Sequence, residues 1–149
     1  MVDTNTIYKK NINDIISIVE YCNTPNQKGV LGVVSSATAL TNVPASLAIQ
    51  VTNPETGNTE TIVNPIYADV LDENQIITIN AVGEGQINVC GEGGDIAIGD
   101  LIVTSSTAGK GMKQADDIVR SCTVAKSREN VTFSSATEIK MIGCTYVSG

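Results

Sequence analysis

The residues of this chain that could do chemistry are serines, a lysine and carboxylates in its C-terminal half. Ser105 or Ser106 with Lys110 could form a Ser-Lys arrangement, in which the amine activates the hydroxyl as a nucleophile. A Ser-His-Asp triad cannot form because the sequence contains no histidine. Serine and threonine are so frequent here that the proximity of these residues means little. We therefore expect no catalytic residues and no enzymatic activity.

Four carboxylates that are close in the sequence could offer oxygen ligands to Ca²⁺, namely Glu84, Glu92, Asp95 and Asp100. Ca²⁺ takes roughly six to eight oxygen ligands, and the D-x-[DN]-x-[DN]-G loop that would arrange them is absent. We interpret these side chains as solvated carboxylates of turns, and Asp116-Asp117 as a further turn before Ile118-Val119. The sequence therefore predicts no metal site.

Several glycines between residues 83 and 99 suggest, at first sight, a loop that cradles phosphate. No G-x-G-x-x-G spacing occurs there. Lys110 also lacks the context of a phosphate loop, since Thr104 and Gly111 stand where that loop has glycine and serine or threonine. We interpret the glycines as turn and bulge residues that supply positive φ, Gly99 in particular, and we expect no cofactor.

Four cysteines are widely separated along the chain, at Cys22, Cys90, Cys122 and Cys144. No pair has the C-x₂-C spacing of a zinc or redox site, and without histidine a Cys/His zinc site cannot form. Each cysteine lies beside strand-like residues, and a free cysteine behaves as a small hydrophobic side chain. We expect four buried, reduced thiols.

Charge and composition argue against several classes of partner. The net charge is −7 and the nine basic residues are scattered, whereas a nucleic-acid surface needs clustered cations. With one Phe and no Trp, the candidates for stacking on sugars are Tyr8, Tyr21, Tyr67 and Tyr146. No apolar run approaches ~18 residues, which argues against insertion into a membrane. The start of the sequence is polar and lacks an apolar signal segment, so we expect synthesis in a cytoplasm.

Short runs of β-branched and apolar residues, separated by turn signals, predict roughly ten short strands. The runs are 14–22, 30–34, 46–52, 59–63, 67–71, 76–82, 86–90, 101–105, 122–126 and 139–147. The first could be a helix by its apolar spacing, but its β-branched residues favour a strand. Ile96 and Ile98, before the Gly99-Asp100 turn, predict a further short strand that returns into 101–103. The sequence therefore predicts an all-β fold, a compact sandwich or barrel, with residues 1–13 as an N-terminal arm and residues 14–149 as a single β-domain.

Two of these runs have faces that bear on partners. In 46–52, Leu47, Ile49 and Val51 share one face, and we expect this strand to be half-buried. In 139–147, Ile142, Cys144 and Tyr146 occupy one face, and Ile139, Met141, Gly143, Thr145 and Val147 occupy the other. Both faces of this last strand therefore need cover, and a partner subunit could supply it.

Four segments in order carry a resemblance to a known group of proteins: 29–35 (GVLGVVS), 98–105 (IGDLIVTS), 109–113 (GKGMK) and 123–126 (TVAK). Together they span most of residues 27–149. In this order they resemble the compact C-terminal β-domains of bacteriophage tail fibres and neck appendages, especially those of marine and cyanobacterial phages.

This resemblance implies a structural protein of the virion, made in the host cytoplasm, that contacts other virion proteins. It implies a self-associating β-module of a tail fibre, head fibre or capsid decoration, with a homotrimer as the leading assembly. Two alternatives remain open, a fibre tip that binds a host receptor or glycan, and an intramolecular chaperone domain that cleaves itself. The cleaving residues of the autoproteolytic relatives do not align with this chain, so none are assigned.

Overall fold

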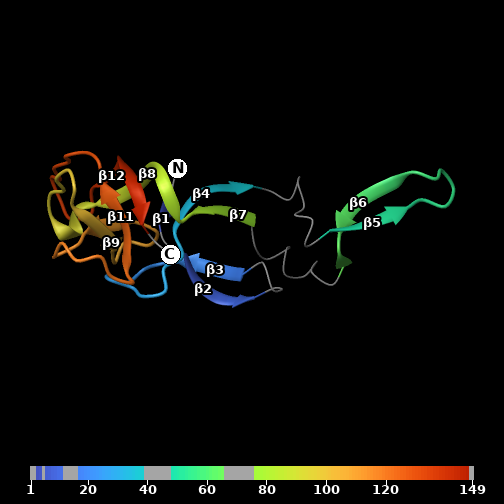
Figure 1. Ribbon diagram of the computed structural model, residues 1–149, viewed down its shortest axis with the longest axis horizontal. Helices are drawn as coiled ribbons and strands as arrows, with labels where there is room; N and C mark the ends of the chain where they lie inside the picture. Colours follow the sequence, from blue (N-terminus) through green and yellow to red (C-terminus); the bar gives the residue numbers. More distant parts are fainter. Residues whose placement is uncertain (1–2, 5, 12–16, 39–47, 66–75, 148–149) are drawn as a thin grey trace.

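The computed structural model describes residues 3–4, 6–11, 17–38, 48–65 and 76–147. The chain is all-β, and five strands of its C-terminal half form a closed barrel. These strands are β8 (Val82–Cys90), β9 (Leu101–Thr104), β10 (Gly111–Lys113), β11 (Thr123–Ser127) and β12 (Ile139–Val147). Figure 1 shows the barrel at one end of the long axis, and the other strands extend away from it. The predicted all-β fold is confirmed, and its compact part is the five-stranded barrel.

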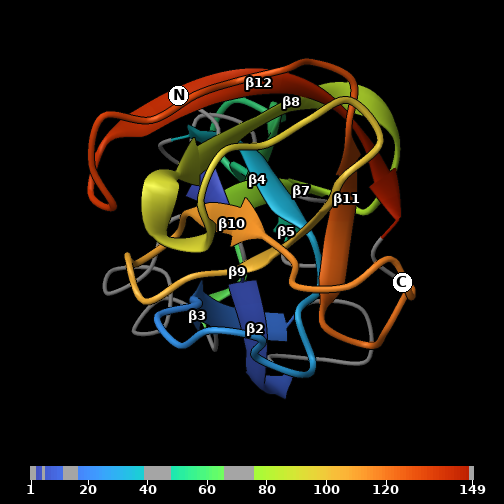
Figure 2. The same cartoon turned by 90° about the vertical axis from the view of Figure 1, so that its left-hand side faces the viewer.

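The barrel closes in the order β10-β8-β12-β11-β9, which Figure 2 shows from the barrel end. The longest pairing is antiparallel, between β8 and β12, and runs from Val82↔Val147 to Cys90↔Ile139. The ring is completed where β10 pairs in parallel with β8 at Gly111. A Cβ on Gly111 would lie 2.6 Å from Ile102 Cγ2, so glycine is required for β10 to approach this closely.

The interior of the barrel is filled by aliphatic side chains, as expected for so few strands. Those at its centre are fully buried: Ile87, Val89, Ile102, Val124 and Ile142. Cys22, Val30 and Val33 from the N-terminal half join the same core. The segment between them is fixed to β9, since Gln27 N donates to Thr104 Oγ1 at 2.7 Å and that hydroxyl donates to Thr24 O at 2.7 Å. The core therefore combines both halves of the chain.

The remaining strands pair outside the barrel. β1 (Asp3–Thr4), β4 (Val33–Thr38) and β7 (Ile76–Asn80) form one sheet, β2 (Thr6–Asn11) pairs with β3 (Ser17–Tyr21), and β5 (Ala48–Thr52) pairs with β6 (Thr59–Val63). Because β4 pairs with β7 and β5–β6 lies between them in sequence, the two pairings are nested. Figure 1 shows β5 and β6 at the end of the molecule opposite the barrel.

Most predicted strands agree with the structure, and 59–63 and 139–147 match β6 and β12 residue for residue. The prediction at 30–34 is displaced, because β4 begins at Val33 while Val30 packs in the core. The run 76–82 is divided at Ala81 between β7 and β8. Residues 17–21 form a strand, so the helical alternative is wrong for them. The predicted strand at 67–71 lies outside the described residues.

The predicted hairpin around Gly99 is wrong in its first strand. Ile96 pairs with Val131 instead of returning onto β9, with backbone N···O distances of 2.9 and 2.8 Å. The loop is turned this way because Asp100 Oδ2 accepts the N–H of Ala97 at 2.7 Å while Gly99 N donates to Ser127 O at 2.9 Å. The predicted turn itself is correct, since Gly99 has φ +93°.

Within the described ranges, no helix is long and apolar enough to cross a membrane.

Candidate functional site

The serines considered as nucleophiles hold loops together in this structure. Ser105 is fully buried, and its hydroxyl donates to the carbonyl oxygens of Lys110 at 2.9 Å and Thr107 at 3.1 Å. Ser106 donates from both its N–H and its hydroxyl to Glu92 Oε2, each at 2.8 Å. The Ser105 hydroxyl thus contacts the main-chain carbonyl of Lys110, whereas a Ser-Lys arrangement needs a contact with the side-chain amine. These contacts close the turn after β9 and fasten it to the segment that follows β8.

The four carboxylates considered as calcium ligands each engage a different partner. Glu84 pairs with Arg128 at 2.7 Å, Glu92 with Ser106, Asp95 Oδ1 with Phe133 N at 2.8 Å, and Asp100 with Lys113 Nζ at 2.8 Å. Burial opposes ionisation of Asp100, but hydrogen bonds from Lys113 and from Ala97 N–H outweigh it and lower its pKa. Among the described residues, no three acidic, cysteine or histidine side chains are grouped to hold a metal.

All four cysteines are buried free thiols, as the sequence predicted: Cys22, Cys90, Cys122 and Cys144. Burial raises the pKa of Cys22 to about 12, with a contribution from nearby Glu20. Burial likewise raises the pKa of Cys144 to about 11. Cys22 and Cys144 are therefore protonated at neutral pH and act as core side chains.

Among the tyrosines considered as sugar platforms, Tyr146 is buried, and its hydroxyl donates to Gln86 O at 2.6 Å. Tyr21 is 45% exposed on β3. Tyr67 lies outside the described residues, and the side chain of Tyr8 is not among those described. Of these candidates, the described part of the chain leaves Tyr21 on the surface.

The hairpin of β5 and β6 has an apolar face that stands open to solvent. Ile49 lies directly opposite Ile62, and Val51 opposite Glu60. Ile49, Val51 and Ile62 are 36%, 44% and 38% exposed. We call these three residues the hairpin face. The expectation that this strand is half-buried is wrong for residues 49–52, which are exposed, and among the described residues no second layer covers the two strands. Leu47, the third residue of the predicted face, lies outside the described residues.

The opposite side of the same hairpin is polar from the Gln50–Thr61 pair to the loop, beyond the apolar pair Ala48–Val63, and hydrogen bonds close the loop. Gln50 lies opposite Thr61, and the hydroxyls of Thr52 and Thr59 are 3.2 Å apart. The loop is closed by Asn53, whose carbonyl accepts Gly57 N at 2.8 Å and whose side chain accepts Glu55 N at 2.9 Å. The hairpin is thus amphipathic, and its apolar face is the one expected to need cover.

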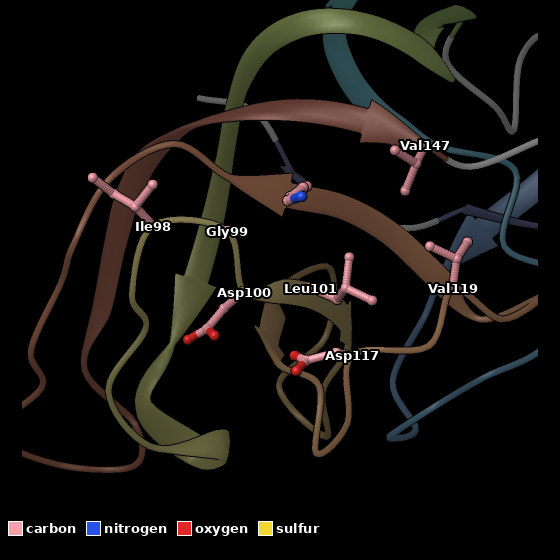
Figure 3. Close-up of a pocket in the computed structure, with 8 residues that line it drawn as sticks. Ile98, Gly99, Asp100, Leu101, Asp117, Val119 and Val147 are labelled. Atoms are coloured by element: carbon pink, nitrogen blue, oxygen red, sulfur yellow. The ribbon is translucent and has the colours of Figure 1, made fainter.

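A second exposed apolar surface lies on the barrel. It surrounds an open depression of about 440 Å³ lined by Ile98, Gly99, Asp100, Leu101, Asp117, Val119, Lys126 and Val147, as Figure 3 shows. Ile98 and Val119 flank it and are 64% and 62% exposed. We call this the barrel depression. Its lining combines aliphatic side chains with two carboxylates, those of Asp100 and Asp117, and with the amine of Lys126.

Hydrogen bonds fix both loops that flank the barrel depression. Gln114 is buried, and its Nε2 donates to Asp116 Oδ1 and to Ile118 O, each at 2.7 Å, while its Oε1 accepts from Thr123 Oγ1 at 2.7 Å. Hydrogen bonds from Arg120 and then Gln114 lower the pKa of Asp116 to about 2. On the other side, Ile98 N donates to Asn130 Oδ1 at 2.8 Å. The exposed aliphatic side chains are therefore carried by ordered backbone.

Sequence reasoning missed these flanking residues, although Ile118-Val119 was assigned to follow a turn. The available signal was an apolar pair placed directly after two aspartates, where a solvated turn is expected to be polar. Ile98 was instead assigned to a strand.

The last strand has the two faces that its alternation predicted. Ile142, Cys144 and Tyr146 are buried in the barrel, whereas Ile139 and Met141 on the outer face are 47% and 50% exposed. Polar side chains interrupt this outer face, since Gln86 and Glu84 of β8 lie opposite Gly143 and Thr145. The outer face of β12 is thus less continuous in its apolar character than the hairpin face.

No family model, no curated protein and no solved structure matches this chain.

Proposed function

We propose that this chain is a structural protein of a bacteriophage virion, a self-associating β-module of a tail fibre, head fibre or capsid decoration that assembles as a homotrimer. The assignment to a virion is supported by the four segments between residues 29 and 126, which resemble phage tail-fibre domains and occur in the same order. The exposed apolar surfaces support association, because such surfaces mark contacts with other proteins. The work of the module is therefore done by surface complementarity.

One observation carries the association part of this proposal, the large surface of the isolated chain. Its accessible surface is 8510 Å². A compact monomer of the same 15.6 kDa mass exposes about 7,300 Å². The difference is about 1,200 Å², which exceeds the roughly 600–1,000 Å² that each partner buries in a specific interface. The elongated shape thus leaves enough additional surface on each chain for one interface.

Light scattering coupled to size exclusion tests the assembly. We expect a mass of about three times 15.6 kDa at micromolar concentration. A stable monomer under these conditions would overturn self-association.

Mass spectrometry and cryo-electron microscopy of purified virions test the location. The chain should be found as a stoichiometric component with defined neighbours, and its absence from virions would overturn the assignment to a phage particle.

The barrel depression favours one second candidate, a fibre tip that docks on a protein receptor of the host. The specific observation is that Ile98 and Val119 are exposed on ordered loops, which lowers the entropy cost of binding. Val119→Asp should then reduce adsorption of the phage to host cells while the assembled mass stays unchanged. Unchanged adsorption would leave the structural role as the better account.

A further inference from the structure

The hairpin of β5 and β6 is too small to be stable by itself in water. An isolated two-stranded hairpin is marginal at best, and independent stability needs a third strand or packing against another element. Among the described elements, β5 and β6 make substantial contact with each other and with no other strand. Their stability therefore calls for a partner outside the described part of this chain.

The face that a partner would cover is defined by the register of the two strands. Ile49 and Ile62 form a direct cross-strand pair, and Val51 lies next to them on the same face. Glu60 shares that face opposite Val51, two pairs nearer to the loop than the Ile49–Ile62 pair. The apolar part can therefore be buried while the Glu60 carboxylate stays at the rim in water.

We infer that the hairpin face of one copy packs against the same face of neighbouring copies, so that Ile49, Val51 and Ile62 form the contact that holds the oligomer together. This inference rests on the proposed self-association and assigns it to a surface. A second copy is the occupant that the area supports, since the excess surface of about 1,200 Å² on one chain is enough for the roughly 600–1,000 Å² that each partner buries in a specific interface. Every copy carries the same aliphatic face, and closed symmetry lets identical faces meet about one axis.

A pair of matched substitutions on β6 tests the assignment. Ile62→Asp places a charge on the hairpin face, whereas Thr61→Asp places the same charge on the opposite, polar side. Both positions are exposed in the single chain, so both variants are expected to keep the barrel folded. By light scattering, Ile62→Asp should lower the assembled mass to that of one chain, and Thr61→Asp should keep the mass of the unmodified protein.

The outcomes separate this inference from the proposal on which it rests. A monomeric unmodified protein would overturn the proposed self-association and the inference with it. An assembled unmodified protein whose mass survives Ile62→Asp would overturn the inference alone, and the outer face of β12 would then be the surface to examine.

Chemical cross-linking decides the question if Ile62→Asp does not fold. Val51→Cys introduces a thiol on the hairpin face, and Thr52→Cys introduces one on the opposite side, next to it in sequence. The four native thiols are buried in the folded protein and should not react. A short bismaleimide should link Val51→Cys chains into covalent dimers on a denaturing gel, at least five times more than Thr52→Cys chains. Equal yields from the two variants would overturn the inference.

Discussion

Gly99 adopts a backbone conformation that residues with a Cβ rarely take. Its φ is +93°, and its N–H ties the turn before β9 to Ser127 at the end of β11. A Cβ there would meet Lys126 Cε at 3.8 Å, an ordinary contact, so space is not limiting. Gly99→Val should therefore destabilise the barrel by roughly 1–3 kcal/mol through backbone strain. Chemical denaturation followed by near-ultraviolet circular dichroism measures this loss.

Gly57 supplies the control for this prediction. It also has a positive φ, +72°, and a Cβ there would meet nothing within 4 Å. The strain of Gly57→Val falls on the loop between β5 and β6, far from the barrel along the long axis in Figure 1. Its effect on unfolding of the barrel should therefore be smaller. Equal losses for the two variants would contradict our account of the Gly99 turn.

The buried thiols predict how stability depends on alkaline pH. The pKa of Cys22 is raised to about 12 and that of Cys144 to about 11, from 9.0 for an unperturbed thiol. Because these pKa values are higher in the folded state, their contribution is complete below pH 9 and is lost as pH rises towards 11 to 12. Each thiol should add a slope of about 1.4 kcal/mol per pH unit in that window.

Denaturation in urea at a series of pH values between 7 and 11 measures this slope. The double substitution Cys22→Ala and Cys144→Ala should lower stability at neutral pH but flatten the decline above pH 9. Burial also raises the pKa of Tyr146, so some decline should remain in the double variant. A decline that is as steep in the double variant as in the unmodified protein would show that these thiols are not its source.

At the scale of elements, Gln114 orders the loop that carries Ile118 and Val119. Gln114→Leu would remove the hydrogen bonds to Ile118 O and to Thr123 Oγ1 at a buried position, at a cost of roughly 1–3 kcal/mol. Exchange of the Arg120 amide hydrogen, which donates to Thr123 Oγ1 at 2.8 Å, should become faster. Hydrogen exchange monitored by NMR checks this result.

The nearby exposed ion pair is the control for that experiment. Arg120 and Asp116 are 2.7 Å apart but both are solvated, and solvated ion pairs contribute little to stability. Arg120→Ala should therefore cost less than Gln114→Leu. The reverse order would indicate that the ion pair, and not the buried amide, holds the loop.

The alternation of apolar and polar residues predicted the strands in which it is regular. It did not predict the pairings that join residues distant in the sequence. β6 and β12 were predicted residue for residue because their alternation is regular. β10 was missed because it has only three residues and because its parallel pairing with β8 joins Gly111 to Val89, which are distant in the sequence. Ile96 was misassigned for the same reason, since its partner Val131 is 35 positions away along the chain.

The sequence predicted that apolar strand faces would bear on partners, but it did not predict which of these faces is exposed. Alternation showed that Ile49 and Val51 share a face, but it does not show what covers that face. We expected the strand to be half-buried, and in the structure residues 49–52 are exposed. Conversely, the inner face of β12 is covered by the barrel, so the last strand requires less from a partner than its sequence suggested. Whether a strand face is buried depends on which element packs against it in three dimensions, and the alternation of residues along one strand does not show this.

At the scale of the whole molecule, the two ends of the chain contribute differently to folding. The barrel core takes in Cys22, Val30 and Val33, so it depends on the N-terminal half as far as the start of β4. The described residues of β5 and β6 contribute no side chain to that core. The barrel and the distal hairpin should therefore be separable by deletion, whereas the barrel and segment 22–33 should not.

Replacing residues 48–63 by a short Gly-Ser turn tests this separation together with the proposed assembly. The variant keeps every described core residue of the barrel, so its melting temperature should stay within a few degrees of that of the unmodified protein at equal chain concentration, after allowance for the stabilisation that assembly itself provides. Its mass by light scattering should be that of one chain, because the hairpin face is gone. Cys22→Asp, which puts a charge into the core instead, should unfold the barrel. A folded variant that lacks 48–63 and still assembles would place the contact on the barrel, at the depression or on the outer face of β12.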